Sequence, residues 1–332
     1  MSVYIIPQSR VPALLPMGEC IDLMADVLRT LARGEAVLPL RSLLRTPDGA
    51  GLLGLMPAFL GTPACMGIKV ISVYFNNAAA GLDTHQGAVL LFEPEHGSLV
   101  AMIDASSVTA IRTAAVSGAA TRALAREDAG DVALIGAGVQ AITHLEAMLA
   151  VRTLRRVRVW SLHPESVRAF AERESKRHGI HVEAVSSARA AVEGADIVCT
   201  TTGAKEPVVN GDWLAPGAHI NAVGACFPDT RELDTSAVVR SRLFVDRRES
   251  ALNEAGDFLI PKREGAIGDD HIVGELGDVF LGKLPGRRSP DEITLFKSLG
   301  IAVEDLAAAH LIWRKARASG TPAIDFGGHR IG

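Results

Sequence analysis

A glycine pattern between residues 132 and 141 carries the clearest chemistry in this sequence. The segment reads VALIGAGVQA, an apolar run followed by G-x-G-x-x-A. In such a pattern Gly136 makes a tight turn, Gly138 lets the backbone approach a pyrophosphate, and Ala141 keeps the following helix close to its strand. The free N–H groups at the start of that helix bind the phosphates. The segment therefore predicts a dinucleotide site, and the alternative is a bare strand-to-helix turn.

The end of the next predicted strand bears on the choice between NAD and NADP. An NAD site has an acidic residue about 20 positions after the glycines, which binds the ribose hydroxyls. Residues 161–164 contain no carboxylate. Ser161 and His163 are candidates to bind a 2′-phosphate, with Arg168 nearby, although His163 could equally be a solvated loop residue. We expect NADPH, with NADH as the alternative.

Two threonines lie at the end of another predicted strand, which is expected over residues 197–201. Thr201 and Thr202 would lie at its carboxyl end, where the cofactor crevice opens in a sheet of this kind. They could line that crevice, or they could be ordinary strand-end capping residues.

The elements that would hold these residues alternate between strand and helix. An alanine-rich helix is expected over residues 113–125. Strands are then expected at 132–135, 156–160, 181–185, 197–201, 219–223 and 243–246. This alternation predicts an α/β fold of the Rossmann type, a doubly wound parallel sheet with helices on both faces.

The first half of the chain is rich in strands and irregular segments. Strands are expected at 68–75, 88–92 and 99–103, and the residues Glu-Pro-Glu-His-Gly at 93–97 predict a hairpin turn. These features predict a second, mostly antiparallel α+β domain. Apolar residues at helical spacing over 301–319 predict a long C-terminal helix, which could run back towards that domain.

The composition narrows the class of protein. A chain of 332 residues has room for about two domains, and its net charge of −4 argues against a nucleic-acid partner. The four cysteines form no CxxC pair, and the ten histidines are scattered, so we expect neither disulfide nor metal. Glycines and prolines interrupt the apolar stretch over 51–71, and the N-terminus lacks a signal-peptide pattern. We expect a cytoplasmic protein without a membrane span.

A series of short motifs resembles the ornithine cyclodeaminase and mu-crystallin family over nearly the whole chain. The motifs are Met56-Pro57-Ala58, Gly67-Ile68-Lys69, Asp104-Ala105, Thr109-Ala110-Ile111-Arg112-Thr113-Ala114-Ala115, the glycine pattern, Asn221-Ala222-Val223-Gly224-Ala225, Arg231-Glu232-Leu233-Asp234, Gly274-Glu275-Leu276-Gly277 and Lys297-Ser298-Leu299-Gly300. Their order and spacing together make the resemblance specific.

The resemblance implies a subunit of two domains. Residues 1–112, joined by 306–332, would bind substrate and form a homodimer, and residues 113–305 would form the Rossmann domain. Members of the family include ornithine cyclodeaminases, alanine dehydrogenases, ketimine reductases and pyrroline-2-carboxylate reductases. Mu-crystallin also binds thyroid hormone.

The resemblance also implies which residues act. Arg41, Lys69 and Arg112 match the positions that hold the substrate carboxylate, a role suited to guanidinium and ammonium groups. Burial on an apolar strand would lower the pKa of Lys69 and make it a proton donor. The competing readings are a surface Lys69, a structural ion pair of Arg112, and Arg45 in place of Arg41.

The remaining expected site residues divide into two sets. Met56, His85 and Cys226 would line the substrate pocket, although a lone histidine is more often structural. The expected cofactor-binding residues are Thr113, Gly136, Gly138, Val139, Gln140, Ser161, His163, Thr201, Thr202, Val223, Gly224 and Ser298.

Cys226 marks a departure from the family pattern. Cyclodeaminases and alanine dehydrogenases of this family have an aspartate at that position. A thiol, with a reference pKa near roughly 8.5, is a poor substitute for a carboxylate. We therefore expect reduction of a cyclic imino acid, 1-pyrroline-2-carboxylate or 1-piperideine-2-carboxylate, to L-proline or L-pipecolate. The alternatives are an ornithine cyclodeaminase with recycled NAD, an alanine-type dehydrogenase and a non-catalytic NADPH binder.

Overall fold

The computed structural model describes residues 2–328, so Met1 and residues 329–332 of the expected first domain lie outside the described part. The chain divides into two compact units. Unit 1 contains the chain up to Arg112 and again from Gly300 onwards, and unit 2 is Thr113–Leu299. The chain thus returns to unit 1 at Gly300, earlier than the expected residue 306, because helix α11 begins at Ala302 and its first turn pairs with residues of unit 1.

Unit 1 is built on one mixed sheet. In spatial order its strands are β16 (Ile324–Asp325), β1 (Ser2–Ile6), β7 (Leu99–Asp104), β6 (His85–Phe92), β5 (Ala64–Val73), β4 (Leu52–Gly61) and β2 (Ala36–Val37), and β3 (Ser42–Arg45) also pairs with β4. Among the described strand pairs of this sheet, only β1 and β7 are parallel. The mostly antiparallel sheet is therefore confirmed, as is the hairpin between β6 and β7.

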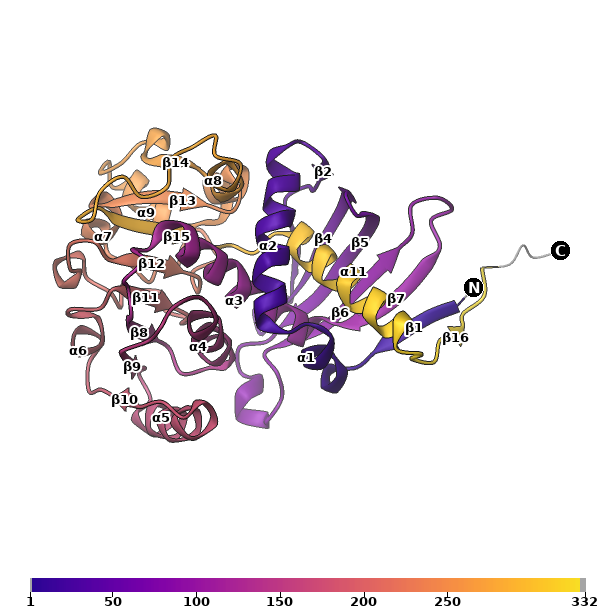
Figure 1. Ribbon diagram of the computed structural model, residues 1–332, viewed down its shortest axis with the longest axis horizontal. Coiled ribbons are helices and arrows are strands. Elements are labelled where there is room, and N and C mark those ends of the chain that lie inside the picture. Colours follow the sequence, from indigo (N-terminus) through magenta and orange to yellow (C-terminus); the bar gives the residue numbers. More distant parts are fainter. Residues whose placement is uncertain (1, 329–332) are drawn as a thin grey trace. The chain divides into compact units, whose positions relative to one another are not determined.

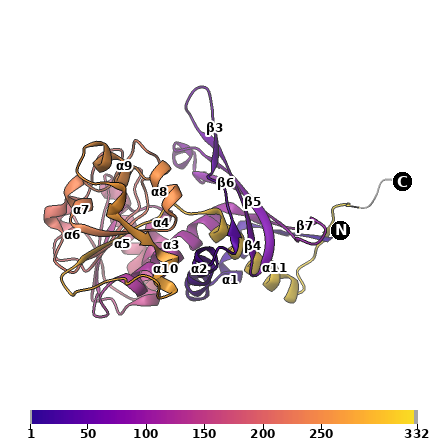
Figure 2. The same ribbon diagram turned by 90° about the horizontal axis from the view of Figure 1, so that it is seen from above.

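Helices cover one face of this sheet. Helix α11 (Ala302–Ala318) packs on β4, β5 and β6, and helix α2 (Met17–Ala32) packs on α11 (Figure 1). Figure 2 shows α1 (Val11–Leu14), α2 and α11 gathered on one side of the strands. The burial of β4 alternates residue by residue, as expected for a strand with one covered face. Neither α2 nor β4 was predicted. In β4, glycines and a proline obscured the alternation of apolar and polar residues.

Unit 2 contains a fully parallel sheet. Figure 1 shows its strands in the order β10 (Val182–Ala184), β9 (Arg156–Trp160), β8 (Asp131–Ile135), β11 (Ile197–Thr200), β12 (His219–Ala222), β15 (Ile293–Lys297), β13 (Ser241–Val245) and β14 (Ile272–Glu275). All described pairs in it are parallel. Strands β11, β12 and β15 are buried along their whole length, which requires cover on both faces. The doubly wound fold is confirmed.

Helices of varied length surround the parallel sheet. The longer ones are α4 (Val139–Val151) and α5 (Pro164–His178), and the others are α6 (Ala188–Val192), α7 (Thr235–Val239), α8 (Arg248–Glu254), α9 (Gly256–Arg263) and α10 (Leu276–Phe280). Short 3-10 turns lie at Gln8–Arg10, Asn77–Ala80, Gly211–Trp213 and Asp269–His271. Among residues 2–328, no helix is long and apolar enough to cross a membrane.

The helix expected over residues 113–125 begins earlier than the sequence indicated. Helix α3 runs over Ala105–Leu124, and the Asp104 carboxylate accepts a hydrogen bond from Ser107 N at 2.8 Å. An aspartate in that position satisfies an N–H group at a helix start, which is a signal that the sequence contained. Because α3 begins at Ala105, Arg112 lies inside the helix.

Candidate functional site

Unit 1 contains a buried group of charged side chains. Lys69 on β5 and Arg112 on α3 are each 3% exposed, and both contact carboxylates at the start of α11. The Lys69 ammonium lies 2.7 Å from the nearer oxygen of Asp305. Arg112 donates from Nε to Asp305 Oδ1 and from a terminal nitrogen to Glu304 Oε2, each at 2.8 Å. The ion pairing of Arg112, one of the competing interpretations, is therefore present.

Arg41 joins this group from the segment before β3. Its guanidinium donates to the Gly300 carbonyl at 3.1 Å. Gly300 also packs against Arg112, because a Cβ there would lie 2.2 Å from one of the Arg112 nitrogens. Arg45, the competing arginine, lies on the exposed strand β3. Arg41 thus lies beside Arg112 and Gly300, and its part in substrate binding stays a prediction. We call Arg41, Lys69, Arg112, Glu304 and Asp305 the cation cluster.

The cation cluster gathers three cationic side chains in unit 1. Lys69 and Arg112 are buried with Asp305 and Glu304, and Arg41 is partly buried beside them. Guanidinium and ammonium groups held together in this way suit the carboxylate of a ligand. The two acidic residues were missed in the sequence analysis. Carboxylates in the first turn of a helix are common because they suit the helix dipole, so nothing marked Glu304 and Asp305 as buried.

Burial and neighbouring charges tune the Lys69 ammonium. Burial lowers the pKa of Lys69 to about 8; the nearby Asp305 opposes this shift, while the charges of Arg112 and Arg41 add to it. Burial acts to raise the pKa of Asp305, but Arg112 and Lys69 lower it overall, so this carboxylate stays ionised. At neutral pH Lys69 is therefore an ammonium that can give up a proton at little cost.

Two other expected substrate residues lie beside the cation cluster. Met56 on β4 is directly opposite Lys69 in the strand register, and both side chains are buried. His85 begins β6 and keeps exposed surface. The atoms packed round its ring and then the charges of Lys69 and Arg112 lower the pKa of His85 to about 4. His85 is therefore a neutral imidazole at physiological pH.

The glycine pattern of unit 2 has the geometry expected of a phosphate-binding turn. Gly136 has a φ of +119°, and a Cβ there would lie 2.6 Å from Thr201 Oγ1. Gly138 is the N-cap of α4, and a Cβ there would meet no described atom within 4 Å. No side chain caps this helix start, and its first turn has no acidic residue. The open space beside uncapped N–H groups fits a pyrophosphate.

The carboxyl ends of five neighbouring strands, β9, β8, β11, β12 and β15, lie along one edge of the sheet at this turn. Gly136 N donates to Trp160 O at 2.7 Å, and Thr201 N donates to Ile135 O at 2.8 Å. The ends of β12 and β15 continue the edge, since Val223 N donates to Thr200 O and Ser298 N to Ala222 O, both at 3.0 Å. The crevice of a doubly wound sheet lies at such an edge, where the strand order reverses.

Three of the expected cofactor residues have buried polar atoms without a partner among residues 2–328. These atoms are Thr113 Oγ1, Gln140 Oε1 and Ser298 Oγ. Buried polar atoms are nearly always hydrogen-bonded, so an unsatisfied one calls for a ligand or a water molecule. Together with the open N-cap at Gly138, these atoms fit a bound dinucleotide.

The residues expected at a 2′-phosphate lie in the turn after β9. Ser161 Oγ accepts a hydrogen bond from His163 N at 3.3 Å, and His163 is exposed at the start of α5. Arg168 pairs with Glu165 on the same exposed turn of helix. Val139 is also exposed, at 56%. These side chains are accessible, and their role stays a prediction.

Comparison with known proteins shows which protein family shares this architecture. The model of the ornithine cyclodeaminase/mu-crystallin family matches residues 3–320. The chain belongs to this family. It is 41% identical to the mouse ketimine reductase mu-crystallin over 280 residues, which are 84% of this chain and 85% of that protein.

Two solved structures resemble the whole chain. One is the Thermococcus litoralis Delta(1)-pyrroline-2-carboxylate reductase in complex with NADH and L-proline, with a TM-score of 0.94 and 39% identity, covering 98% of this chain and 100% of that one. The other is an archaeal alanine dehydrogenase dimer with bound NAD, with a TM-score of 0.92 and 31% identity, covering 98% and 100%.

Cys226 lies just past the end of β12, at the position where the family's cyclodeaminases have an aspartate. Its thiol is half-buried and donates to the Val223 carbonyl at 3.3 Å. A thiol engaged with the backbone replaces a carboxylate here, as the sequence indicated.

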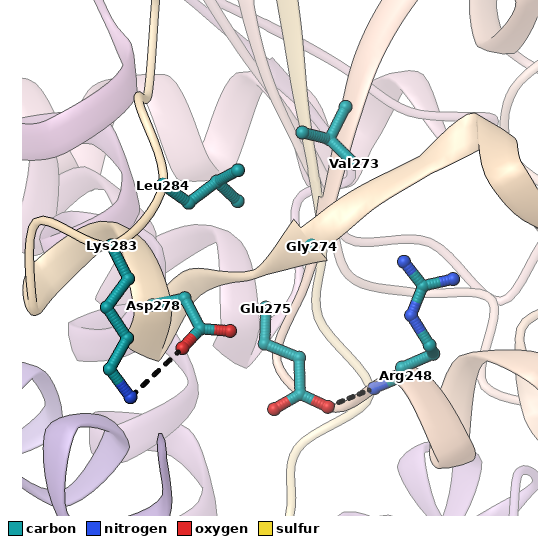
Figure 3. A pocket seen from close by; sticks show the side chains of 7 residues that line it. All are labelled: Arg248, Val273, Gly274, Glu275, Asp278, Lys283 and Leu284. Atoms are coloured by element: carbon teal, nitrogen blue, oxygen red, sulfur yellow. Dashed lines mark hydrogen bonds and ion pairs between the residues drawn. The ribbon is translucent and has the colours of Figure 1, made fainter. Parts of the chain in front are cut away.

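A separate hollow of about 520 Å³ lies at the edge strand β14 (Figure 3). Its lining residues are Arg248, Val273, Gly274, Glu275, Asp278, Lys283 and Leu284. The Glu275 carboxylate accepts from Arg248 N at 2.8 Å, and Lys283 pairs with Asp278 at 3.9 Å (Figure 3). In this hollow a backbone N–H group thus satisfies Glu275, and Asp278 pairs with Lys283. We do not assign it a function.

Proposed function

We propose that this chain reduces a small cyclic imino acid, 1-pyrroline-2-carboxylate or 1-piperideine-2-carboxylate, to L-proline or L-pipecolate with NADPH or NADH. The observation that carries the proposal is the cation cluster, in which Lys69, Arg112 and Arg41 present ammonium and guanidinium groups suited to the carboxylate of such a substrate. The likeness to a reductase whose structure holds NADH and L-proline supports the same reaction.

The proposed roles follow from the chemistry of each residue. Arg41, Lys69 and Arg112 bind the substrate carboxylate, and Glu304 and Asp305 hold two of these cations in place. Fixing the carboxylate orients the planar imine, and that orientation lowers the barrier to reaction. When bound, the nicotinamide supplies the hydride that is added to the imine carbon.

The imine nitrogen must carry a proton in the reduction. A substrate can bind already protonated, or Lys69 or an ordered water can supply the proton. Lys69 suits this role because its pKa of about 8 keeps it protonated at neutral pH and makes it a stronger acid than an ordinary lysine. Cys226 speaks against ornithine cyclisation, which needs a carboxylate to accept the amine proton.

A stoichiometric assay tests this function. Purified protein with 1-pyrroline-2-carboxylate is expected to oxidise one NADPH or NADH per proline formed, measured by nicotinamide absorbance and amino-acid analysis. We expect NADPH to be the better donor, because no carboxylate lies in residues 161–164. Release of ammonia from ornithine with catalytic NAD would instead identify a cyclodeaminase. Binding of NADPH with no turnover of imino acids, ornithine or alanine would identify a binder.

We also propose that unit 1 forms a homodimer through the uncovered face of its sheet. Apolar residues in register line that face: Leu53, Leu55, Pro57, Phe59, Met66, Ile68, Val70, Leu90, Phe92, Val100 and Met102. Leu53 and Phe59 are 36% and 38% exposed. A continuous apolar face of this kind marks an interaction surface, and a second copy suits it because homodimers are the commonest oligomers.

Light scattering on a sizing column tests the homodimer. The wild-type chain is expected to elute with the mass of two chains, and Phe59→Lys with the mass of one, because a buried lysine ammonium would oppose association. Val239→Lys is a matched control, since Val239 is 46% exposed in unit 2. A monomeric wild type, or a dimer that persists unchanged in Phe59→Lys, would contradict the proposal.

A further inference from the structure

A buried carboxylate of unit 2 makes contacts that the proposed chemistry does not use. Glu232 is fully buried in the segment that follows β12. Its side chain accepts four hydrogen bonds, two on each oxygen. Oε1 accepts from Thr202 N at 2.6 Å and from Thr202 Oγ1 at 2.8 Å. Oε2 accepts from Thr200 Oγ1 and from Gly224 N, each at 2.7 Å.

These four bonds join two strand ends of the crevice. Thr200 and Thr202 belong to the end of β11, and Gly224 follows the end of β12. The approach is so close that a Cβ on Gly224 would lie 2.0 Å from Thr202 O and 2.6 Å from Glu232 Oε1. The carboxylate thus holds in place the backbone of two segments that the sequence and the fold mark for the cofactor.

The backbone of Glu232 is itself held by a second buried carboxylate. Asp257 Oδ1 accepts from Glu232 N at 2.8 Å and from Leu233 N at 3.1 Å. Its other oxygen accepts from the Lys297 ammonium at 2.9 Å. Lys297 ends β15 and precedes Ser298, whose hydroxyl has no partner among residues 2–328. The network therefore reaches a third strand end at the same edge of the sheet.

We propose that Glu232 is a positioning residue for the nicotinamide cofactor, which it serves by fixing the ends of β11 and β12 in the shape that the cofactor requires. The inference rests on the cofactor part of the proposed function and is independent of the imino-acid substrate. Glu232 itself is fully buried behind these segments and acts through Thr202 and Gly224.

The geometry makes Glu232→Gln a demanding test. Each carboxylate oxygen accepts from one backbone N–H group, Thr202 on one side and Gly224 on the other. In either orientation of a glutamine amide, its NH₂ group would face a backbone donor. Neither donor can turn away as a hydroxyl can. The nearly isosteric change must therefore displace one of the two strand ends.

The experiment compares two fully buried carboxylates of unit 2. Glu232→Gln is expected to weaken NADH or NADPH binding about 10- to 100-fold, the effect of losing a hydrogen bond to a buried charged group. In steady state the KM for the cofactor should rise more than the KM for the imino acid. Glu174→Gln is the control, since Glu174 is fully buried and pairs with Arg173 near the end of α5. Binding is measured by fluorescence titration, well below each thermal midpoint.

The outcomes separate a positioning role from a structural one. A purely structural Glu232 would lower the thermal midpoint and leave cofactor affinity at the level of Glu174→Gln, which would overturn the proposal. If Glu232→Gln does not fold, Glu232→Asp provides the test, because a shorter carboxylate keeps the charge but cannot reach both strand ends. Unchanged affinity in Glu232→Asp would also overturn it. Because titration needs no substrate, the result holds whichever substrate the chain turns over.

Discussion

Replacing Lys69 with methionine is expected to lower kcat/KM for the imino acid by about 10²- to 10⁴-fold, the usual worth of a general acid. The change removes the ammonium that we propose binds the substrate carboxylate and protonates the imine. Asp305 keeps its bond from Arg112 Nε at 2.8 Å, so the buried carboxylate is not left alone. The variant should therefore fold, and steady-state kinetics with saturating cofactor will measure the loss.

The dependence of activity on pH provides a second test of the role of Lys69. Lys69 acts as the protonated form, and its pKa is about 8 in the folded chain. Activity that depends on it is thus present below pH 8 and is lost as the pH rises through that value. The wild-type kcat/KM should fall above about pH 8, and the fall should be absent from the residual activity of Lys69→Met.

Two controls make the Lys69 result decisive. Arg45→Met removes an exposed cation of β3 and is expected to leave kcat/KM unchanged. Cofactor affinity should be the same in Lys69→Met as in the wild type, because Lys69 belongs to unit 1 and the cofactor residues to unit 2. A Lys69→Met variant with wild-type kcat/KM would exclude Lys69 from the reaction.

Replacing Gly138 with valine is expected to weaken binding of the cofactor at least about 100-fold. The backbone there has φ −91° and ψ −167°, which residues other than glycine also adopt, and a Cβ would meet no described atom within 4 Å. The folded chain should therefore accept the side chain, at a cost of about 1 kcal/mol for an unfavourable N-cap. The valine would occupy the space that the pyrophosphate needs.

Thermal denaturation with and without NADH separates binding from folding. A bound ligand raises the thermal midpoint by an amount that grows with the logarithm of its affinity, so Gly138→Val should lose that rise and keep nearly the wild-type midpoint without ligand. Gly136→Ala is the contrasting variant. Its φ of +119° and the 2.6 Å approach of a Cβ to Thr201 Oγ1 should lower the midpoint even without cofactor. An NADH-induced rise in Gly138→Val equal to that of the wild type would rule out this phosphate site.

Local patterns were enough to predict the fold class and the family. The parallel sheet was predicted because its strands are apolar runs separated by alanine-rich helices, and β8, β9, β11, β12 and β13 lie within a few residues of their expected positions. The start of α3 and the strands β4, β14 and β15 were not predicted. The three strands lack a clear period, since glycines, prolines or full burial remove the alternation by which a strand is identified.

Some residues of the site could be predicted from local sequence, and others were identified only by the tertiary structure. The glycine pattern predicted its own turn, since the positive φ of Gly136 and the open N-cap at Gly138 are properties of a few adjacent residues. The family resemblance indicated Lys69, Arg112 and Arg41 as positions. It did not indicate Glu304 and Asp305, which lie almost 200 residues along the chain from Arg112.

The sequence by itself determined the parallel sheet, the glycine turn between β8 and α4 and the family, because each depends on the order and types of neighbouring residues. Only the tertiary structure decided which buried charges meet. The pairing of Lys69 and Arg112 with α11, and the four bonds to Glu232, arise where distant segments fold together. A carboxylate has no local pattern that marks it as buried; its surroundings decide whether it stays ionised, what it holds and which reaction it can serve.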